Sequence, residues 1–396
     1  MYESFPELGA SASVTSALAA RGITKPFQIQ AMVAPDALAG RDVLAKSRTG
    51  SGKTLAFAIP IVETIEATGS PSALILVPTR ELATQVAEEF KAISKAKGLY
   101  VSAVYGGVGL PEQAKRAARS DIVVATPGRL EDLATRKMIR LDQIKILVLD
   151  EADRMLDMGF QPQVDRLVRR IPAKRQTMFF SATLDGAVGH LARSYTNEPV
   201  THEIASPMQT VDEVDHVFVK VDHRDKVARL IELLTKDPGM SLVFVRTKRG
   251  ADRLTTRLKA KGVSAAAIHG DLTQGARERA LKMFERGKVS VLVATDVAAR
   301  GLDLDGITHV INFDPPEDHK AYVHRVGRTA RAGKAGIGIT LVSPDQQGDV
   351  GRVAARLKLG SEFEAEGMKV PAPAVAYASH RGRKSMMGGR RPRRRV

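Results

Sequence analysis

Short apolar runs alternate with amphipathic stretches through the first half of the chain. The runs cover residues 42–45, 73–77, 101–105, 122–125, 146–149 and 177–181, and stretches with a helical pattern, such as 80–95 and 111–118, separate them. Continuously apolar strands that alternate with helices are typical of a parallel sheet covered by helices on both faces. The pattern predicts an α/β domain over residues 1–202.

The same alternation returns after a polar interval. Residues 196–213 carry two prolines and no sustained helical period, which indicates a linker at 203–212. Apolar runs then recur at 217–221, 241–245, 265–268, 290–294, 310–313 and 338–342. A chain of 396 residues is too long for one ordinary hydrophobic core. We therefore expect a second α/β domain over residues 213–367.

The last segment, residues 368–396, has a different composition. From His380 onward it contains eight Lys or Arg residues and no acidic residue. Such a segment is too polar and too charged to bury a core, so we expect it to be disordered. Its charge suits an electrostatic tether to a polyanion, and a tail that serves only solubility is the alternative.

Charge and cysteine content narrow the class of protein. The net charge of +16 favours a polyanionic partner such as nucleic acid, and an unspecific basic surface is the alternative. No apolar run approaches the ~20 residues that a membrane helix needs, and no secretory signal is visible. The chain has no cysteine, which excludes disulfides and thiolate metal sites and fits a cytoplasmic protein.

A phosphate-binding loop is predicted between the first apolar run and a helix at 55–64. The general pattern is Gly-x-x-x-x-Gly-Lys-Ser/Thr. Here Ser47 takes the first position, followed by Thr49, Gly50, Ser51, Gly52, Lys53 and Thr54. The glycines let the backbone wrap closely around phosphate oxygens. Lys53 would reach the β- and γ-phosphates and Thr54 would bind magnesium; a plain glycine turn is the alternative.

Two acids stand directly after the apolar run 146–149. In α/β proteins, ligands bind at the carboxyl ends of the strands. Asp150 would hold a magnesium ion, and Glu151 would orient or deprotonate the attacking water. The alternative is that both acids cap the following helix. With the phosphate-binding loop upstream, the pair indicates ATP hydrolysis.

In this order, the motifs resemble those of the DEAD-box ATP-dependent RNA helicases of superfamily 2. Residues 150–153 spell Asp-Glu-Ala-Asp, and the family's motifs can be found between residues 5 and 345. The resemblance implies two RecA-like domains joined by a flexible linker, with ATP and RNA bound across the cleft. It implies ATP and Mg²⁺ as cofactors, and local unwinding of RNA duplexes or remodelling of ribonucleoproteins as the function.

The resemblance places adenine recognition near the N-terminus. Phe5 looks like the family's upstream aromatic, which stacks on adenine, and Gln30 looks like the glutamine that bonds the adenine edge and selects ATP. Phe27 stands where the family usually has a small hydroxyl residue. This departure removes one supporting hydrogen bond and leaves the Gln30 contact in place.

The RNA-binding residues are also implied by the resemblance. They are hydroxyl, glycine and arginine positions of both domains, which are groups that contact phosphates without reading bases. The set comprises Thr79, Arg80, Gly106, Gly107, Thr126, Arg129, Thr247, Arg277 and Thr295. We therefore expect RNA binding with little sequence preference by a monomer, and leave open further partners in ribonucleoproteins or RNA decay.

The second domain would complete the catalytic site. By resemblance, Asp303 contacts the ATP ribose and His324 hydrogen-bonds toward the acids. Arg325, Arg328 and Arg331 recur at three-residue spacing, on one face near a helix start. The resemblance makes Arg328 and Arg331 arginine fingers that reach the γ-phosphate across the cleft; a solvated basic helix is the alternative.

Two other functions use the same motifs. An ATP-gated RNA clamp would close on RNA inside a larger assembly without separating strands, and the sequence barely distinguishes it from a helicase. A DNA-directed translocase of superfamily 2 is the third hypothesis, for which the sequence has no extra accessory domain.

Overall fold

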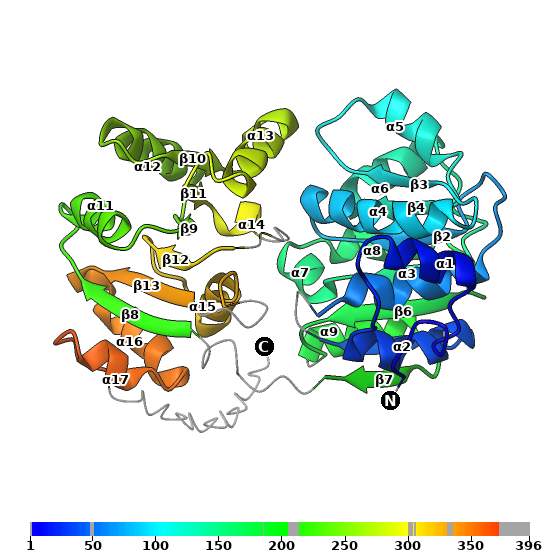
Figure 1. The fold of residues 1–396 in the computed structure, drawn as a ribbon, viewed down its shortest axis with the longest axis horizontal. Coiled ribbons are helices and arrows are strands. Elements are labelled where there is room, and N and C mark those ends of the chain that lie inside the picture. Colours follow the sequence, from blue (N-terminus) through cyan, green and yellow to red (C-terminus); the bar gives the residue numbers. More distant parts are fainter. Residues whose placement is uncertain are drawn as a thin grey trace, which may run out of the picture.

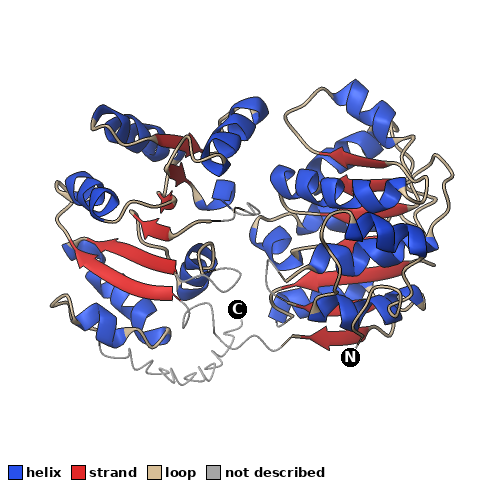
Figure 2. Cartoon of the chain, in the orientation of Figure 1, coloured by secondary structure: helices blue, strands red, loops and turns tan. Residues whose placement is uncertain are grey.

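The computed structural model describes residues 2–47, 51–184, 186–204, 214–299, 304, 306–330 and 336–371. The chain forms two domains that lie side by side (Figure 1). Each has a parallel sheet with helices on both faces (Figure 2). The predicted pair of α/β domains is therefore confirmed.

The N-terminal domain contains a seven-stranded sheet in the order β3-β4-β2-β5-β6-β1-β7, in which every neighbouring pair is parallel. Its strands are β1 (Val43–Lys46), β2 (Ala73–Leu76), β3 (Val101–Val104), β4 (Ile122–Ala125), β5 (Ile146–Leu149), β6 (Gln176–Ser181) and β7 (Val200–Glu203). Its helices are α1 (Ala12–Ala19), α2 (Gln28–Leu38), α3 (Lys53–Thr64), α4 (Arg80–Lys95), α5 (Leu110–Ala117), α6 (Pro127–Thr135), α7 (Ala152–Asp157), α8 (Gln161–Val168) and α9 (Gly186–Tyr195).

The C-terminal domain contains a six-stranded parallel sheet in the order β10-β11-β9-β12-β13-β8. Its strands are β8 (Val214–Lys220), β9 (Ser241–Phe244), β10 (Ala265–Ile268), β11 (Val291–Ala294), β12 (His309–Asn312) and β13 (Gly336–Val342). Its helices are α11 (Lys226–Lys236), α12 (Lys248–Ala260), α13 (Gln274–Glu285), α14 (Asp296–Ala299), α15 (His319–Val326), the 3₁₀ turn η1 (Pro344–Gln346), α16 (Gln347–Arg356) and α17 (Gly360–Glu364).

Alternate residues of each central strand enter different cores. In β2, Ala73 and Ile75 pack in the same cluster as Phe57 of α3, whereas Leu74 and Leu76 pack in the cluster on the opposite face. A strand that is buried on both faces has no position for a polar side chain. This double burial explains why the strand sequences are continuously apolar.

The structure differs from the expected boundary between the domains. β7 was not predicted, because its short sequence is polar and half-exposed, which is typical of an edge strand. It pairs with β1 and extends the first sheet to Glu203. β8 begins at Val214, and residues 205–213 of the predicted linker lie outside the described residues.

The C-terminal domain also extends past its expected end at residue 367. Met368 is buried in the domain core, and Val370 packs against the same cluster. The folded part of the chain therefore includes the start of the segment that we expected to be disordered. Residues 372–396 of that segment lie outside the described ranges. Within those ranges, no helix is both long and apolar enough to cross a membrane.

The parallel topology brings the predicted motifs together. All strands of a parallel sheet end at the same edge, so the loops that follow them are neighbours. In the N-terminal sheet these loops carry Ser47, Thr79, Thr126 and Asp150 after β1, β2, β4 and β5. Each motif is therefore local in sequence, and the sheet gathers them into one site.

Candidate active site and nucleic-acid interface

A cavity of about 790 Å³ lies at this edge of the N-terminal sheet. Its lining includes the start of α3, the two acids Asp150 and Glu151, and residues of α4. Residues of the segment from Gly22 to Gln30 line it as well. The volume is typical of a site for a small-molecule ligand or cofactor. Residues predicted to bind the phosphates and residues predicted to recognise adenine therefore line one cavity.

The phosphate-binding loop ends in a glycine that its geometry requires. Gly52 has a φ of +82°, and a side chain there would come within 2.7 Å of Gln30 Nε2. Lys53 is buried, its Nζ donates to the carbonyl oxygen of Ser47 at 3.3 Å, and it lies 3.9 Å from Asp150 Oδ1. The ammonium is thus held between the loop and the acid. Thr49 and Gly50 lie outside the described residues.

Asp150 and Glu151 are buried but differ in their electrostatic surroundings. Burial raises the pKa of Asp150 to about 6, although Lys53 opposes the shift. Burial would also raise the pKa of Glu151, but the nearby positive charges of Arg154, Lys53 and Arg328 outweigh it and keep that pKa below its usual value. The ion pair between Arg154 Nη1 and Glu151 Oε2 measures 2.6 Å.

Glu151 also has an unusual backbone. Its φ of 51° and ψ of 48° are left-handed, a conformation that few non-glycine residues adopt. The backbone N–H of Glu151 donates to Asp150 Oδ1 at 2.9 Å, and this bond orients the carboxylate of Asp150. Local strain of this kind often accompanies function. The alternative that the acids are ordinary helix caps finds no side-chain cap bond at α7.

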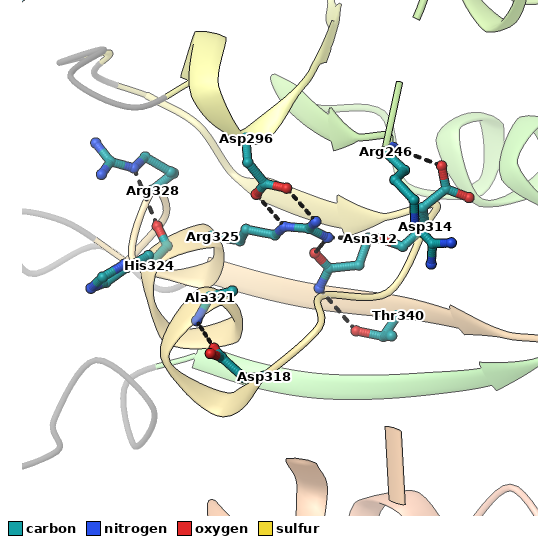
Figure 3. Close-up of polar contacts among 10 residues, drawn as sticks. All are labelled: Arg246, Asp296, Asn312, Asp314, Asp318, Ala321, His324, Arg325, Arg328 and Thr340. Atoms are coloured by element: carbon teal, nitrogen blue, oxygen red, sulfur yellow. Dashed lines mark hydrogen bonds and ion pairs between the residues drawn. The ribbon is translucent and has the colours of Figure 1, made fainter. Parts of the chain in front are cut away.

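Arg328 is a residue of the second domain whose charge reaches Glu151. It lies in the turn after α15, is buried, and is close enough to Glu151 to lower the pKa of that carboxyl group. Its Nε donates to the carbonyl oxygen of His324 at 3.3 Å (Figure 3). The contact of His324 with the acids stays a prediction. Arg331 and Asp303 lie outside the described residues.

The arginines of the predicted finger motif are not equivalent. The helix ends at Val326, so Arg325 lies in its last turn and Arg328 beyond it, not near a helix start as we expected. Arg325 forms a bidentate ion pair with Asp296 at 2.6 and 2.7 Å and donates to Asn312 Oδ1 at 3.0 Å (Figure 3). Arg325, to which the resemblance gave no finger role, therefore makes its contacts within its own domain.

Of the residues predicted to recognise adenine, Gln30 lines the cavity and Phe5 does not, and the adenine contact of each stays a prediction. Gln30 is buried, accepts from the Phe27 N–H and donates to the carbonyl oxygen of Gly52, each at 2.9 Å. Its amide keeps one further donor and one lone pair for a ligand. Phe5 is 1% exposed in the core of the domain and is not among the residues that line the cavity, whereas Phe27 is 62% exposed and lines it.

A second cavity of about 330 Å³ lies between the two domains. Six of the predicted RNA-binding residues line it: Thr79, Arg80, Gly106, Thr126, Arg129 and Arg277. The guanidinium of Arg80 rests directly on Gly106 and Gly107, where side chains would displace it. Thr247 and Thr295 do not line this cavity. The RNA role of the set stays a prediction, but the structure brings most of it together.

Several of these residues also have structural contacts. The Thr79 hydroxyl accepts from Leu82 N–H at 3.2 Å and caps α4, and Thr247 caps α12 in the same way. Arg129 Nη1 donates to the carbonyl oxygen of Val108 and to Gln113 Oε1, each at 3.1 Å. These contacts position the loops around the cavity.

An ion pair across the domain interface was not predicted. Arg277 Nε donates to Glu81 Oε1 at 2.7 Å, and the two side chains are 7% and 8% exposed. The same guanidinium donates to the carbonyl oxygens of His269 at 3.1 Å and Ala298 at 3.4 Å. Arg277 therefore joins the domains, and nothing in the local sequence of Glu81 indicates its partner.

The sequence matches two protein families. One is DEAD/DEAH box helicase over residues 27–191, and the other is Helicase conserved C-terminal domain over residues 225–333. The chain is 41% identical over 357 residues to the DEAD-box ATP-dependent RNA helicase CshA of Geobacillus kaustophilus (strain HTA426), and the alignment covers 89% of this chain and 76% of that protein.

Solved structures resemble the whole arrangement. The structure of S. cerevisiae Dbp5 bound to RNA and ADP BeF3 is 32% identical, with a TM-score of 0.80 over 92% of this chain and 93% of that one. A Dbp5 variant bound to Gle1 and IP6 is 31% identical, with a TM-score of 0.71 over 94% of this chain and 96% of that one. Both alignments cover more than nine-tenths of this chain, so the resemblance extends over both domains.

The fold and the site define a two-domain helicase with RecA-like domains, as the sequence predicted. More narrowly, the chain belongs to the DEAD-box ATP-dependent RNA helicase family.

Proposed function

We propose that this helicase binds ATP in the N-terminal cavity and hydrolyses it when single-stranded RNA spans both domains. The hydrolysis is coupled to local unwinding of RNA duplexes or to remodelling of ribonucleoproteins. The observation that carries this proposal is the cavity in which Lys53, Asp150 and Glu151 meet. The buried ion pair between Arg277 and Glu81 holds the second domain against the first, and the charge of Arg328 lowers the pKa of Glu151.

The triphosphate lies along the loop and Lys53. Asp150 and Thr54 line the same cavity, and a carboxylate and a hydroxyl beside phosphate oxygens suit Mg²⁺, which takes few ligands from protein. When bound, Mg²⁺ neutralises charge on the β- and γ-phosphates.

Glu151 orients and deprotonates the attacking water. Its lowered pKa keeps it ionised at neutral pH, and the ion pair with Arg154 fixes one carboxylate oxygen. Glu151 lines the cavity, so its carboxylate group is placed to act on a water bound there. Arg328 stabilises the negative charge that develops on the transferred phosphoryl group, as an arginine finger does.

Single-stranded RNA lies in the interdomain cavity. Arg80, Arg129 and the backbone N–H groups near Gly106 offer donors to phosphates, which gives affinity without sequence preference. Contacts to 2′-hydroxyl groups favour RNA over DNA. Because both ligands favour the closed form, each tightens the binding of the other.

The direct test measures ATP hydrolysis with and without single-stranded RNA. We expect strong stimulation by RNA and weaker stimulation by DNA of the same length. Glu151→Gln should lower the RNA-stimulated rate by roughly 10²- to 10⁴-fold while ATP still binds. Glu66→Gln, a change at an exposed residue shortly after α3, is the matched control and should hydrolyse ATP normally. An equal rate with and without RNA contradicts the proposal.

A second candidate, an ATP-gated RNA clamp, is favoured by the buried Arg277–Glu81 pair, which stabilises the closed form. A duplex-displacement assay separates the two functions. Release of the displaced strand during ATP turnover supports the helicase. RNA-stimulated turnover with no strand release at any duplex length supports the clamp.

A further inference from the structure

The nucleotide cavity has one aromatic residue on its described wall. This residue is Phe27, at the start of α2. It is 62% exposed, although an aromatic ring of this size is usually buried. The other described residues that line the cavity are polar, aliphatic or glycine.

Its position is fixed by the same contacts that form the site. The Phe27 N–H donates to Gln30 Oε1, and its carbonyl oxygen accepts from the N–H groups of Gln30 at 2.9 Å and Ala31 at 3.0 Å. Its ring packs on the backbone of Gly52, where a side chain would overlap it. The ring therefore lies between the residue that reads the base edge and the loop that holds the phosphates.

The fold itself gains little from an aromatic residue here. Phe27 occupies the N-cap position of α2, where Ser, Thr, Asp or Asn would accept a hydrogen bond from the first turn. Phe27 makes no side-chain cap bond, and most of its ring is exposed to the cavity. A residue that is unfavourable for the helix and faces a ligand cavity is better explained by the ligand.

We propose that Phe27, and not Phe5, is the aromatic residue that stacks on the base of the nucleotide. The inference rests on the proposed binding of ATP in this cavity. Phe5 is buried in the core with Leu8 and Val14 and offers no ring face to the cavity. Stacking accepts any base, so Phe27 supplies affinity while Gln30 supplies selectivity for adenine.

The test compares Phe27→Leu with Phe27→Tyr in the full-length chain. Leucine keeps an apolar side chain without an aromatic face, and tyrosine keeps the face. Loss of stacking on one base weakens binding by roughly 5- to 150-fold. We therefore expect the ATP dissociation constant of Phe27→Leu to rise within this range and that of Phe27→Tyr to stay near the wild-type value. Inorganic triphosphate, which has no base, should bind all three proteins equally.

A control variant and a fluorescent variant extend the comparison. Tyr100→Leu removes an aromatic ring that is 71% exposed and lies outside the cavity, so it should leave ATP binding unchanged. The chain has no tryptophan, so Phe27→Trp introduces a single tryptophan. Its emission should change with ATP and not with inorganic triphosphate.

Three results would overturn the inference: wild-type ATP affinity in Phe27→Leu, an equal loss of affinity for inorganic triphosphate, or a larger loss in Phe5→Leu than in Phe27→Leu. They are distinguishable from failure of the proposed function. A wild-type chain that binds no ATP refutes both, whereas a wild-type chain with RNA-stimulated hydrolysis and an unaffected Phe27→Leu variant refutes only the stacking.

Discussion

The buried ion pair between Arg277 and Glu81 makes a specific prediction about domain closure. Both side chains are almost inaccessible, and they come from different domains. When the domains separate, water solvates both charges, so the pair acts on the equilibrium between open and closed forms. The stability of each separate domain should not depend on it.

The magnitude follows from the contacts that each variant retains. Glu81→Gln removes the charge but keeps an oxygen acceptor, and hydrogen bonds to charged groups are worth about 1.5–3 kcal/mol. A loss of this size in the closed form alone corresponds to a roughly 10- to 150-fold change in the equilibrium. The RNA concentration for half-maximal ATPase stimulation should rise by a similar factor, while the thermal unfolding midpoint stays close to wild type.

The direction of the change decides between two roles for Arg277. If Arg277 served only as a phosphate contact for RNA, Glu81→Gln would release it and remove a nearby negative charge, and RNA would bind more tightly. A higher RNA concentration for half-maximal stimulation of Glu81→Gln supports the interdomain pair, and a lower one refutes this reasoning. Arg277→Met combined with Glu81→Gln should cost less than the sum of the single changes, because the two share one interaction.

Three further changes test the site. Burial raises the pKa of Asp150 to about 6, and nucleotide binding with Mg²⁺ requires its carboxylate. The affinity for ATP should therefore fall as the pH drops below that value, by roughly tenfold per pH unit, and ATP titrations of Asp150→Asn should lack this pH dependence. Arg328→Ala should lower the RNA-stimulated turnover by roughly 10³- to 10⁵-fold while the affinity for ATP is kept, and Arg352→Ala is the surface control. Normal turnover of Arg328→Ala at saturating RNA would exclude the finger role. Arg325→Lys keeps the charge but loses the bidentate contact with Asp296 and the bond to Asn312. It should destabilise the C-terminal domain by about 1–3 kcal/mol in urea unfolding, and an unchanged transition would show that these contacts do not stabilise the domain.

The central strands were predictable from sequence because they are buried on both faces. β2 and β5 contain only apolar residues, and a run of this kind bounded by helices has one common explanation. β7 was missed because Val200 is the one apolar residue of the strand Val200–Glu203, so the sequence shows no strand pattern there. Its place in the sheet is set by pairing with β1, which is a tertiary contact.

The phosphate-binding loop and the acids were predictable for a different reason, since their chemistry requires fixed spacing in the chain. The roles that depend on contacts distant in sequence were not. The burial of Phe5 and the exposure of Phe27, on which the proposed stacking rests, become visible only when the fold is known. The difference between Arg325 and Arg328 depends on where α15 ends, and their equal spacing hides it.

The position of β7 has a mechanical consequence. The chain leaves the N-terminal domain from this strand, whose neighbour β1 runs straight into the phosphate-binding loop. Lys46 closes the pair from β1, through an ion pair with Glu203 at 2.6 Å and a bond from Ile204 N–H to its carbonyl oxygen at 3.1 Å. Adjacent strands are ~4.8 Å apart. A force that the second domain exerts through the polypeptide therefore acts on β7, the strand next to the one that precedes the phosphate-binding loop.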